Sequence, residues 1–429
     1  MSFILYIPGR MNRRQGLLAL FLLIFTLGAG AQQAFPSAYD FIYGLFEPDP
    51  NEGLTVFLST LIPMGGAAES MGMAYTAVAQ DASFLELNPA GSALLERTQI
   101  ALFHNNWIQD TRIESAIYAV RFGTLGLAAG GKWLYLPFTE RDDYGYRVTS
   151  GYYSEALAIG NVSLHLFPGY YFYGVSVGAN IKLAYRSMPD YGDDLGGVIK
   201  GSGASQSALA IMTDIGLLTR FNLFKLYSSR SKNFSIGMAV KNIGPTVMDE
   251  PLPTVATLGL AYNFFRPILL SADISKPINL QDLSQSEKLY WGVGYSMVIT
   301  DFWSLRAGLL VKGANPRISA GASIAFFPMT LDVNYTLDLT TQFTALNRIS
   351  ITARFDLGDM GRASRSAMVD SLYIGGLEAY AANNLEKAIE LWTKALDVDP
   401  YFDPAREART NAVASLELQQ RILDLQRLE

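Results

Sequence analysis

Five cations stand near the ends of segments in which apolar and polar residues alternate. Arg186, Lys241 and Lys312 close such segments, and Arg317 and Arg348 open others. A period of two puts alternate side chains on opposite faces of a strand, which places all five on the polar face near one end. Arginine and lysine bind carboxylates through charge-assisted hydrogen bonds, so this set could hold the acid headgroup of a ligand. The alternative is pairing with acids on the same face or in nearby loops, such as Asp190, Asp193, Asp194 and Asp338.

Residue types suited to catalysis or metal binding are scarce. The chain has no cysteine and two histidines, His104 and His165, and neither histidine lies near a nucleophile motif such as G-x-S-x-G. The absence of cysteine excludes a thiol nucleophile and a cysteine metal site. The net charge of −6 argues against nucleic acid as a partner. We therefore expect no enzyme activity, no metal and no cofactor.

The elements that must position the five cations read as strands. In residues 330–338, Leu331, Val333, Tyr335 and Leu337 fall on one face and polar residues fall on the other. The same alternation recurs and predicts about fourteen strands: 98–107, 113–122, 124–136, 154–167, 171–187, 207–219, 233–243, 253–264, 267–275, 288–299, 302–312, 317–327, 328–338 and 346–357. Connections are mostly short on one side and long on the other, which is typical of an antiparallel outer-membrane barrel with its short turns in the periplasm.

Aromatic residues cluster at the ends of the predicted strands, among them Trp107 and Tyr170 to Tyr173. We expect them to form the interfacial girdles of a membrane barrel. The alternative is that they are ordinary core residues.

The N-terminus carries the features of a secretory signal peptide. Arg10, Arg13 and Arg14 precede an apolar run from Leu17 to Leu27, and small residues follow at 29–31. A charged region, an apolar core and a small-residue cleavage site are the parts of such a peptide. We assign residues 1–31 to it, with either Met1 or Met11 as the start. Residues 32–97 lack clean alternation and are predicted to form a plug segment ahead of the barrel at 98–357.

The C-terminal block is predicted to be helical. After a linker at 358–365, residues 366–429 are rich in Ala, Leu and Glu. Gly376, Ala388, Trp392, Ala395 and Pro400 have the spacing of one tetratricopeptide repeat. A single repeat cannot build a solenoid, so it should dock on the barrel, self-associate or bind another periplasmic protein. A purely structural cap is as good an interpretation as partner binding.

Residues 63–94 carry a resemblance to a known group. The stretch MGGAAESMGMAYTAVAQDASFLELNPAGSAL contains an Asp-Ala-Ser and then Asn88, Pro89, Ala90 and Gly91. It resembles the N-terminal hatch of the FadL superfamily, including its PorV branch and the FadL-like proteins of spirochaetes. Weaker likenesses at 240–244, 252–253 and 305–308 extend the resemblance over roughly 60–357. The alternative for Asn88-Pro89 is a simple tight turn.

The resemblance implies a fourteen-stranded barrel plugged by its N-terminal segment. FadL-type proteins pass long-chain fatty acids or similar hydrophobic molecules, which leave sideways into the membrane where the third strand is kinked. Gly130 and Gly131 interrupt the predicted third strand, and glycines within strands often mark a bulge or kink. The alternative is a packing contact between these glycines and the plug.

Taken together, the sequence predicts an all-β transmembrane barrel of about fourteen antiparallel strands with a hatch and a small all-α tail. The expected function is uptake of long-chain fatty acids or related molecules across the outer membrane. The expected partners are such ligands, outer-membrane lipid and the barrel assembly machinery, with the hatch N-terminus and the tail on the periplasmic side. The alternatives are a PorV-like scaffold whose tail recruits partners, and a general porin, against which the plug argues.

Overall fold

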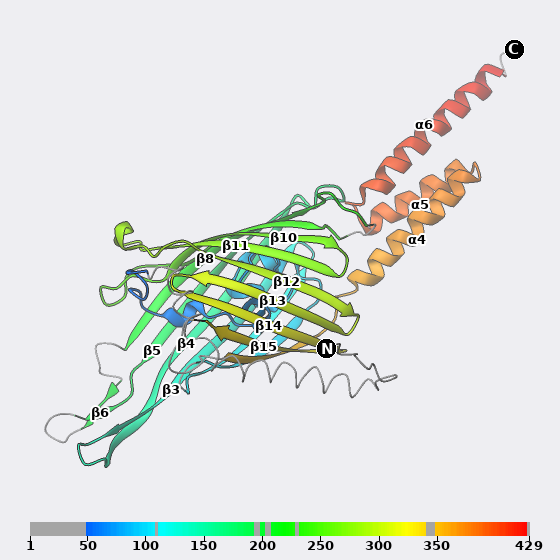
Figure 1. Ribbon diagram of the computed structural model, residues 1–429. Coiled ribbons are helices and arrows are strands. Elements are labelled where there is room, and N and C mark those ends of the chain that lie inside the picture. The colour runs from blue at the N-terminus through cyan, green and yellow to red at the C-terminus, as the bar shows by residue number, and fades with distance from the viewer. Residues whose placement is uncertain are drawn as a thin grey trace, which may run out of the picture.

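The computed structural model describes residues 49–107, 110–192, 198–201, 207–227, 231–339 and 348–426. The predicted signal peptide at 1–31 lies outside the described residues, as do Asp193 and Asp194. Figure 1 shows a closed barrel with three helices projecting from one end. No helix among the described residues is long and apolar enough to cross a membrane.

The barrel wall is built from fourteen antiparallel strands. They are β1 (Gln99–Asn106), β2 (Arg112–Phe122), β3 (Leu125–Arg141), β4 (Arg147–Leu166), β5 (Val175–Ser187), β8 (Ala208–Phe221), β9 (Phe234–Ile243), β10 (Thr254–Phe265), β11 (Ile268–Ile278), β12 (Tyr290–Thr300), β13 (Trp303–Lys312), β14 (Asn315–Phe326), β15 (Met329–Asp338) and β16 (Arg348–Asp356). Each pairs with its neighbours along the chain, and β1 closes the ring on β16. The predicted fold class and strand number are confirmed.

Two predicted connections are wrong in detail. Residues 137–153 were expected to form a long loop, but β3 and β4 continue as a paired hairpin to Arg141 and Arg147. Polar residues there occupy both faces, so the period-two signal disappears although the pairing persists. Residues 171–174 were assigned to a strand, whereas β5 begins only at Val175. A small pair, β6 (Tyr191–Gly192) with β7 (Val198–Ile199), lies in the connection between β5 and β8.

Side chains of the wall alternate between the lumen and the outside. In β4, for example, Ala156 to Leu166 alternate strictly between exposed even positions and buried odd positions. The outer surface is apolar over many strands: exposed side chains there include Leu102, Tyr118, Leu127, Val162, Ile181, Leu183, Ile211, Leu258, Ile274, Val293, Ile318 and Val333. The inward positions carry Asn161, Asn180, Lys182 and Asp214, which are all buried.

The lumen is filled by the N-terminal segment, which we define as residues 49–97. It contains the short helices η1 (Leu58–Leu61), α3 (Gly66–Ser70), η2 (Ala82–Glu86) and η3 (Pro89–Leu94). Its small residues permit close packing on the wall: a Cβ added at Gly178 on β5 would lie 2.2 Å from the carbonyl oxygen of Pro89. Residues 64–95 are almost entirely buried.

The N-terminal segment begins at the end of the barrel that lies away from the helices. The Asp49 carboxylate accepts from the backbone of Lys288, and Asn51 donates to Ser286 O at 3.2 Å. Both partners lie in the connection between β11 and β12, whereas the helices follow β16 at the opposite end (Figure 1). The plug was expected to begin at residue 32 on the same side as the tail, and residues 32–48 lie outside the described residues. From residue 49 onward the segment crosses the lumen from one mouth to the other.

Three helices form the C-terminal module: α4 (Arg362–Ala381), α5 (Leu385–Val398) and α6 (Asp403–Gln426). Among the described residues of the barrel loops, η5 (Leu283–Gln285) is a further short helix. Ala388, Trp392 and Ala395 on α5 are buried against α4. The small helical module is therefore present as predicted, beginning four residues earlier than expected. Its tetratricopeptide character stays a prediction.

Aromatic contacts fasten the module to the barrel. The ring of Tyr170, in the turn between β4 and β5, meets Phe402 edge-on at 5.2 Å between centroids. Tyr170 N donates to the Asp403 carboxylate at 3.2 Å, and Tyr171 OH donates to Glu407 at 3.1 Å. Arg362 donates to Glu96 O at 2.6 Å. Tyr170 thus packs against the C-terminal module rather than forming part of an interfacial girdle.

We expect Gly376→Leu to loosen the module and leave the barrel intact. A Cβ at Gly376 would lie 2.3 Å from Nε1 of Trp392, and that ring is itself buried. Overpacking of this kind costs about 1–3 kcal/mol. Circular dichroism should show earlier melting of helix at an unchanged barrel signal. Gly375→Leu is the matched control, since its added Cβ would meet Leu391 at 3.6 Å; equal melting of both variants would contradict the expectation.

Candidate functional site

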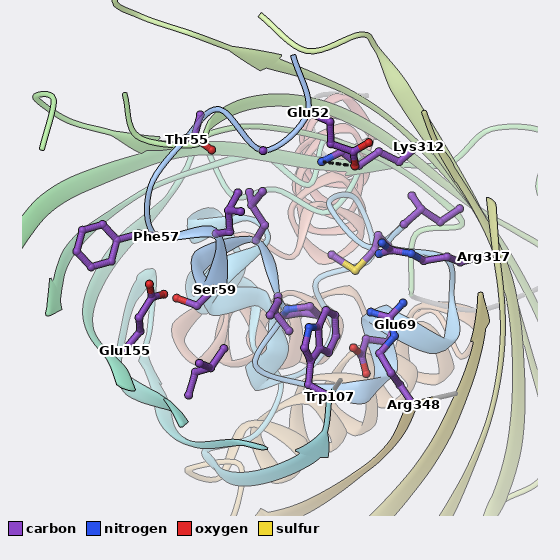
Figure 2. Close-up of a pocket in the computed structure, with 18 of the residues that line it drawn as sticks. Glu52, Thr55, Phe57, Ser59, Glu69, Trp107, Glu155, Lys312, Arg317 and Arg348 are labelled. Atoms are coloured by element: carbon purple, nitrogen blue, oxygen red, sulfur yellow. Dashed lines mark ion pairs between the residues drawn. The ribbon is translucent and has the colours of Figure 1, made fainter. Parts of the chain in front are cut away.

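A cavity of about 490 Å³ lies between the N-terminal segment and the wall, at the mouth away from the helices. Figure 2 shows its lining, with Phe57 and Ser59 of the segment opposite Trp107, Arg317 and Arg348 of the wall. Its apolar lining comes from both parts: Val56, Phe57, Leu58, Leu61, Ile62, Met73, Leu134 and Leu310. A partly apolar cavity of this size with a few convergent polar groups is the usual form of a small-molecule site.

Arg348 is the most buried cation at the cavity. It opens β16, is 4% exposed, and its guanidinium lies 4.1 Å from the centroid of the Trp107 ring. No acid lies within ion-pair distance of it in the described part of the chain, and its buried Nε has no hydrogen-bond acceptor there. A buried donor left without an acceptor costs about 1–3 kcal/mol. An oxygen of a bound anion would remove that penalty.

The other cavity cations are neutralised to different degrees. Arg317 lies 3.7 Å from Asp338, yet its Nε also lacks a hydrogen-bond acceptor. Lys312 forms an ion pair with Glu287 at 2.9 Å, and its ammonium lies 5.6 Å from the Tyr290 ring centroid. Pairing with acids, the alternative set out above, thus applies to Lys312 and in part to Arg317.

Arg186 lies across the cavity from this group. Its guanidinium is 5.5 Å from the ring centroid of Phe57 in the N-terminal segment, and it also contacts Met248. Four of the five predicted cations therefore line one cavity. Lys241 does not: its electrostatic neighbours are Lys182, Asp214 and Glu86, deeper in the wall. The expectation that it shares the mouth with the others is not met.

Glu69 brings an acid to the same place from the N-terminal segment. It lies in α3, where its carboxylate accepts hydrogen bonds from Asn105 at 3.2 Å and Ser350 at 2.9 Å. Burial raises the pKa of Glu69, and the charge of Arg348 opposes that rise. The residues Glu69 and Arg348 face the same cavity. A second anion bound there would compete with Glu69 for the positive field of Arg348.

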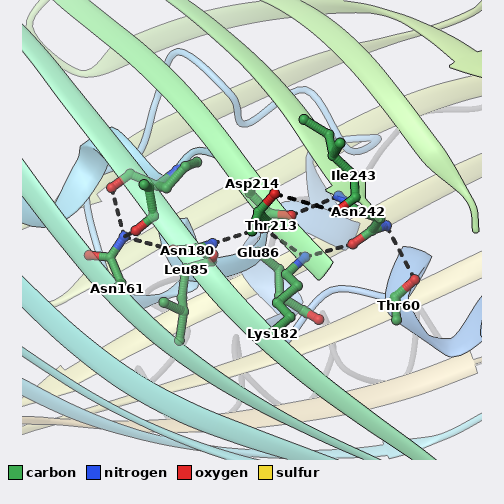
Figure 3. Close-up of polar contacts among 12 residues, drawn as sticks. Thr60, Leu85, Glu86, Asn161, Asn180, Lys182, Thr213, Asp214, Asn242 and Ile243 are labelled. Carbon is green, nitrogen blue, oxygen red and sulfur yellow. Dashed lines mark hydrogen bonds and ion pairs between the residues drawn. The ribbon is translucent and has the colours of Figure 1, made fainter. Parts of the chain in front are cut away.

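Below the cavity, buried charges join the N-terminal segment to the wall. Lys182 and Asp214, both fully buried, form an ion pair at 2.8 Å, and Asn180 and Asn242 complete the bonds of Asp214 (Figure 3). Asn180 also donates to Leu85 O in the segment at 2.6 Å. The Lys182–Asp214 pair lies within the wall, between β5 and β8, whereas two other ion pairs join the segment to the wall: Lys132 with Glu86 at 2.7 Å, and Arg354 with Asp81 at 2.6 Å.

Asn88, in the motif that resembles a hatch, acts as both a turn residue and a tether. Its side-chain oxygen accepts from Ala90 N at 3.1 Å and caps η3, which begins with Pro89. Its Nδ2 donates to Thr76 O at 2.9 Å and to Leu217 O of β8 at 3.0 Å. Gly91 allows close contact, since a Cβ there would lie 2.6 Å from Cβ of Phe84.

We expect Asn88→Ala to loosen the N-terminal segment without opening the wall. The change removes a cap and takes a donor from the buried Thr76 carbonyl and the part-buried Leu217 carbonyl, at a cost of about 1–3 kcal/mol. Hydrogen exchange of residues 76–95 should accelerate about tenfold, the factor for 1.4 kcal/mol. Thr213→Ala is a suitable control, because its hydroxyl makes one exposed bond to Ile243 O. Unchanged exchange in Asn88→Ala would contradict the expectation.

Gly130 and Gly131 lie in unbroken strand pairing. Gly130 pairs with Ile117 on one side and Ile159 on the other, without a register shift. A Cβ at Gly130 would lie 2.7 Å from Leu85 of the N-terminal segment. The packing interpretation therefore accounts for Gly130. A lateral exit at this pair stays a prediction, for which the described residues offer no opening in the ladder.

Three site residues were missed by sequence reasoning. Trp107 was assigned to an interfacial girdle but lies under Arg348, one residue beyond the end of β1. Glu69 and Glu52 were not singled out, although both line the cavity. An acid among the small residues of Gly-Gly-Ala-Ala-Glu-Ser is the one signal that could have drawn attention to Glu69.

The sequence of residues 47–359 matches the profile of the uncharacterised protein family UPF0164. A UPF0164 protein of Treponema pallidum (strain Nichols) is 30% identical over 418 residues, covering 93% of this chain and 92% of that protein. Among solved structures, the CymD monoaromatic hydrocarbon channel has 14% identity and a TM-score of 0.49, covering 70% of this chain and 98% of its own. A Pseudomonas aeruginosa FadL homologue has 12% identity and a TM-score of 0.45, covering 68% and 98%.

Proposed function

Because the chain belongs to the family UPF0164, whose description gives no activity, we propose its function from the wall and the cavity. The proposal is that the protein is an outer-membrane barrel that takes up hydrophobic molecules with an acidic headgroup, long-chain fatty acids being the model ligand. The resemblance of residues 63–94 to a FadL hatch supports it. The observation that carries it is the cavity that joins apolar lining to the arginine pair Arg348 and Arg317.

The outer surface supports membrane insertion. Large apolar side chains lie exposed on strand after strand around the wall, such as Leu183 and Ile211. Soluble monomers rarely expose contiguous apolar patches of more than a few hundred Å². In a membrane barrel, outward residues face lipid and inward residues are polar. This is the distribution that the alternating burial of β4 and β5 shows.

The cavity supports binding of an amphiphile. Arg348 and Arg317 present buried donors that lack acceptors, and Phe57, Leu58 and Met73 offer an apolar surface beside them. The two arginines would compensate the charge of a carboxylate placed between them. The hydrocarbon tail of the same ligand would cover the apolar lining of the cavity. We place ligand exit near Gly131 as a part of this proposal, where a hollow indents the outer face of the wall.

The filled lower lumen favours a second candidate, a scaffold barrel. Residues 64–95 are almost wholly buried and are joined to the wall by pairs such as Lys132 with Glu86. A ligand could pass straight through the lumen only if these contacts between the N-terminal segment and the wall were broken. A barrel that recruits partners through its helical module needs no passage at all.

Mass spectrometry of the retained ligands distinguishes the uptake barrel from the scaffold barrel. The full chain, refolded in detergent with equimolar oleate and oleyl alcohol, should retain oleate in preference, because only oleate offers a charge to Arg348. Retention of neither would favour the scaffold. Equal retention of both would contradict the acid-headgroup part of the proposal and leave apolar binding in place.

A further inference from the structure

Three neighbouring strands carry a row of aromatic side chains at the end of the barrel that bears the helices. Phe221 closes β8, Phe234 opens β9 and Tyr262 lies near the end of β10, and Phe234 pairs directly with both of the others. The ring centroids are 5.0 and 5.8 Å apart. The row lies on the outer face, because Met238 and Leu260, which share its face on β9 and β10, are exposed. Such a row is typical of the boundary between hydrocarbon and headgroups.

The connections beyond this row carry cations and no acid. Lys225 and Lys232 lie between β8 and β9, and Arg266 lies in the turn between β10 and β11. Residues 215–248 and 251–272 contain neither aspartate nor glutamate. The chain therefore contributes only positive side-chain charge to this edge of the barrel from these two connections.

The three cations lie close together. The hydroxyl of Tyr262 donates to Phe224 O at 3.4 Å, which fixes the connection between β8 and β9 beside the end of β10. Burial and the charge of Arg266 lower the pKa of Lys225, and burial and the charge of Lys225 lower the pKa of Lys232. Each cation thus repels the next, and an anion among them would relieve that repulsion.

Large apolar side chains are exposed beside these cations. Phe224 and Leu226 precede and follow Lys225 in the sequence and are 80% and 65% exposed. Phe264 and Phe265, at the end of β10, are exposed as well. Apolar side chains next to lysines are the composition of a segment that lies in the membrane interface. There the apolar groups enter the hydrocarbon layer while the ammonium groups stay among the lipid headgroups.

Neutral groups hold the two lysines in position. Lys232 Nζ donates to Tyr170 O at 2.6 Å and lies 5.6 Å from the centroid of the same ring. Lys225 Nζ donates to Ser231 O at 2.5 Å and lies 5.3 Å from the Tyr227 ring centroid. Carbonyl oxygens and aromatic rings stabilise an ammonium group without removing its charge.

The acids of α6 that approach this region have other partners. Asp403 accepts from Tyr170 N at 3.2 Å and forms an ion pair with Arg406, and Glu407 accepts from Tyr171 OH at 3.1 Å. Within the described part of the chain, no acid lies within ion-pair distance of Lys232. Its charge is therefore left for an anion from outside the chain.

We propose that the connection between β8 and β9, together with Arg266, binds an anionic phospholipid in the leaflet at the helix-bearing end of the barrel. Lys225, Lys232 and Arg266 attract its phosphate, and Phe224 and Leu226 enter the hydrocarbon layer beside its acyl chains. Clustered lysine and arginine at a membrane boundary favour anionic lipid. A lipid fits better than a soluble anion, because only a lipid also covers the exposed apolar side chains. The proposal rests on the membrane location given above and is independent of any ligand in the lumenal cavity.

The test is lipid retention by the full-length protein. The barrel is reconstituted in vesicles of equimolar phosphatidylglycerol and phosphatidylethanolamine with identical acyl chains, extracted in mild detergent and measured by native mass spectrometry. The wild type should retain phosphatidylglycerol in preference. The double variant Lys225→Gln/Lys232→Gln should lower that preference about tenfold. Phe224→Ser/Leu226→Ser, which keeps the cations, should lower the retention of both lipids.

The matched control is Lys387→Gln/Lys394→Gln, which removes the same number of lysines from the exposed face of α5. It should leave the preference unchanged, and excess glycerol phosphate should not displace the retained lipid. Equal retention of the two lipids by the wild type would overturn the proposal. So would an unchanged preference in the Lys225→Gln/Lys232→Gln variant, an equal loss in the control, or displacement by glycerol phosphate.

Failure of the proposed function would give a different result. A chain that does not insert into the vesicles would contradict the membrane location itself. Loss of selectivity for oleate over oleyl alcohol, with the preference for phosphatidylglycerol intact, would contradict the cavity proposal alone.

Discussion

Arg348→Glu is expected to weaken oleate binding by about a hundredfold and to abolish measurable uptake in reconstituted cells. The substitution places a second acid next to Glu69 and removes the guanidinium whose Nε lacks an acceptor. Charge-assisted hydrogen bonds are worth about 1.5–3 kcal/mol each, and each 1.4 kcal/mol corresponds to tenfold in affinity. Titration of the purified barrel with a fluorescent fatty acid gives the affinity, and labelled oleate gives the uptake.

Three further variants test whether the loss of binding comes from the Arg348 guanidinium rather than from a general change of charge. Arg348→Gln removes the charge without adding an acid and should weaken binding about tenfold. Arg186→Glu should have a smaller effect than Arg348→Glu, because Arg186 lies on the other side of the cavity against Phe57. Lys394→Glu on α5, an exposed residue of the helical module, is the control for net charge. Undiminished binding by a correctly assembled Arg348→Gln barrel would exclude a carboxylate site at this arginine.

The strands of the wall could be predicted because the alternation of apolar and polar residues can be read within each strand's own sequence. Each strand between the two mouths has one face toward apolar surroundings, and the alternation therefore persists along it, as in residues 330–338. Where polar residues occupy both faces, as in residues 137–153, the alternation fails, so the predicted third strand ended too early and the predicted fourth strand began too late. Tyr170 shows the opposite error: an aromatic residue at a strand end is typical of a girdle, but this one packs on Phe402.

The site could be predicted only in part. Strand direction and alternation show near which mouth a side chain lies and whether it points into the lumen, but they do not show which residues it contacts. They placed Arg186, Lys312, Arg317 and Arg348 at one mouth, where the structure has them. They could not show that Trp107 lies beneath Arg348, because that contact joins the end of β1 to the start of β16 across the closure of the barrel. The partners that the N-terminal segment supplies, such as Glu69, depend on how an irregular chain packs within the lumen.

Asp214→Leu is expected to destabilise the folded barrel by about 3–5 kcal/mol, the cost of leaving one member of a buried ion pair alone. Asp214 is fully buried and accepts from Lys182, from Asn180 and from the backbone of Asn242. Its loss leaves the buried Lys182 ammonium with the neutral amide oxygen of Asn242 in place of a carboxylate, and it removes one acceptor from Asn180 and the acceptor of the Asn242 amide. Urea unfolding of the barrel refolded in phospholipid vesicles, followed by tryptophan fluorescence, measures the change.

The partner of the pair should behave differently. Lys182→Met removes one of three donors to Asp214, and the carboxylate keeps Asn180 and the Asn242 amide. We therefore expect a smaller loss from Lys182→Met than from Asp214→Leu, and a double variant close to Lys182→Met, because burying two apolar groups in place of an ion pair is often nearly neutral. Additive losses in the double variant would show that the two residues act separately. In that case the network of Figure 3 would not be the unit that holds the N-terminal segment against the wall.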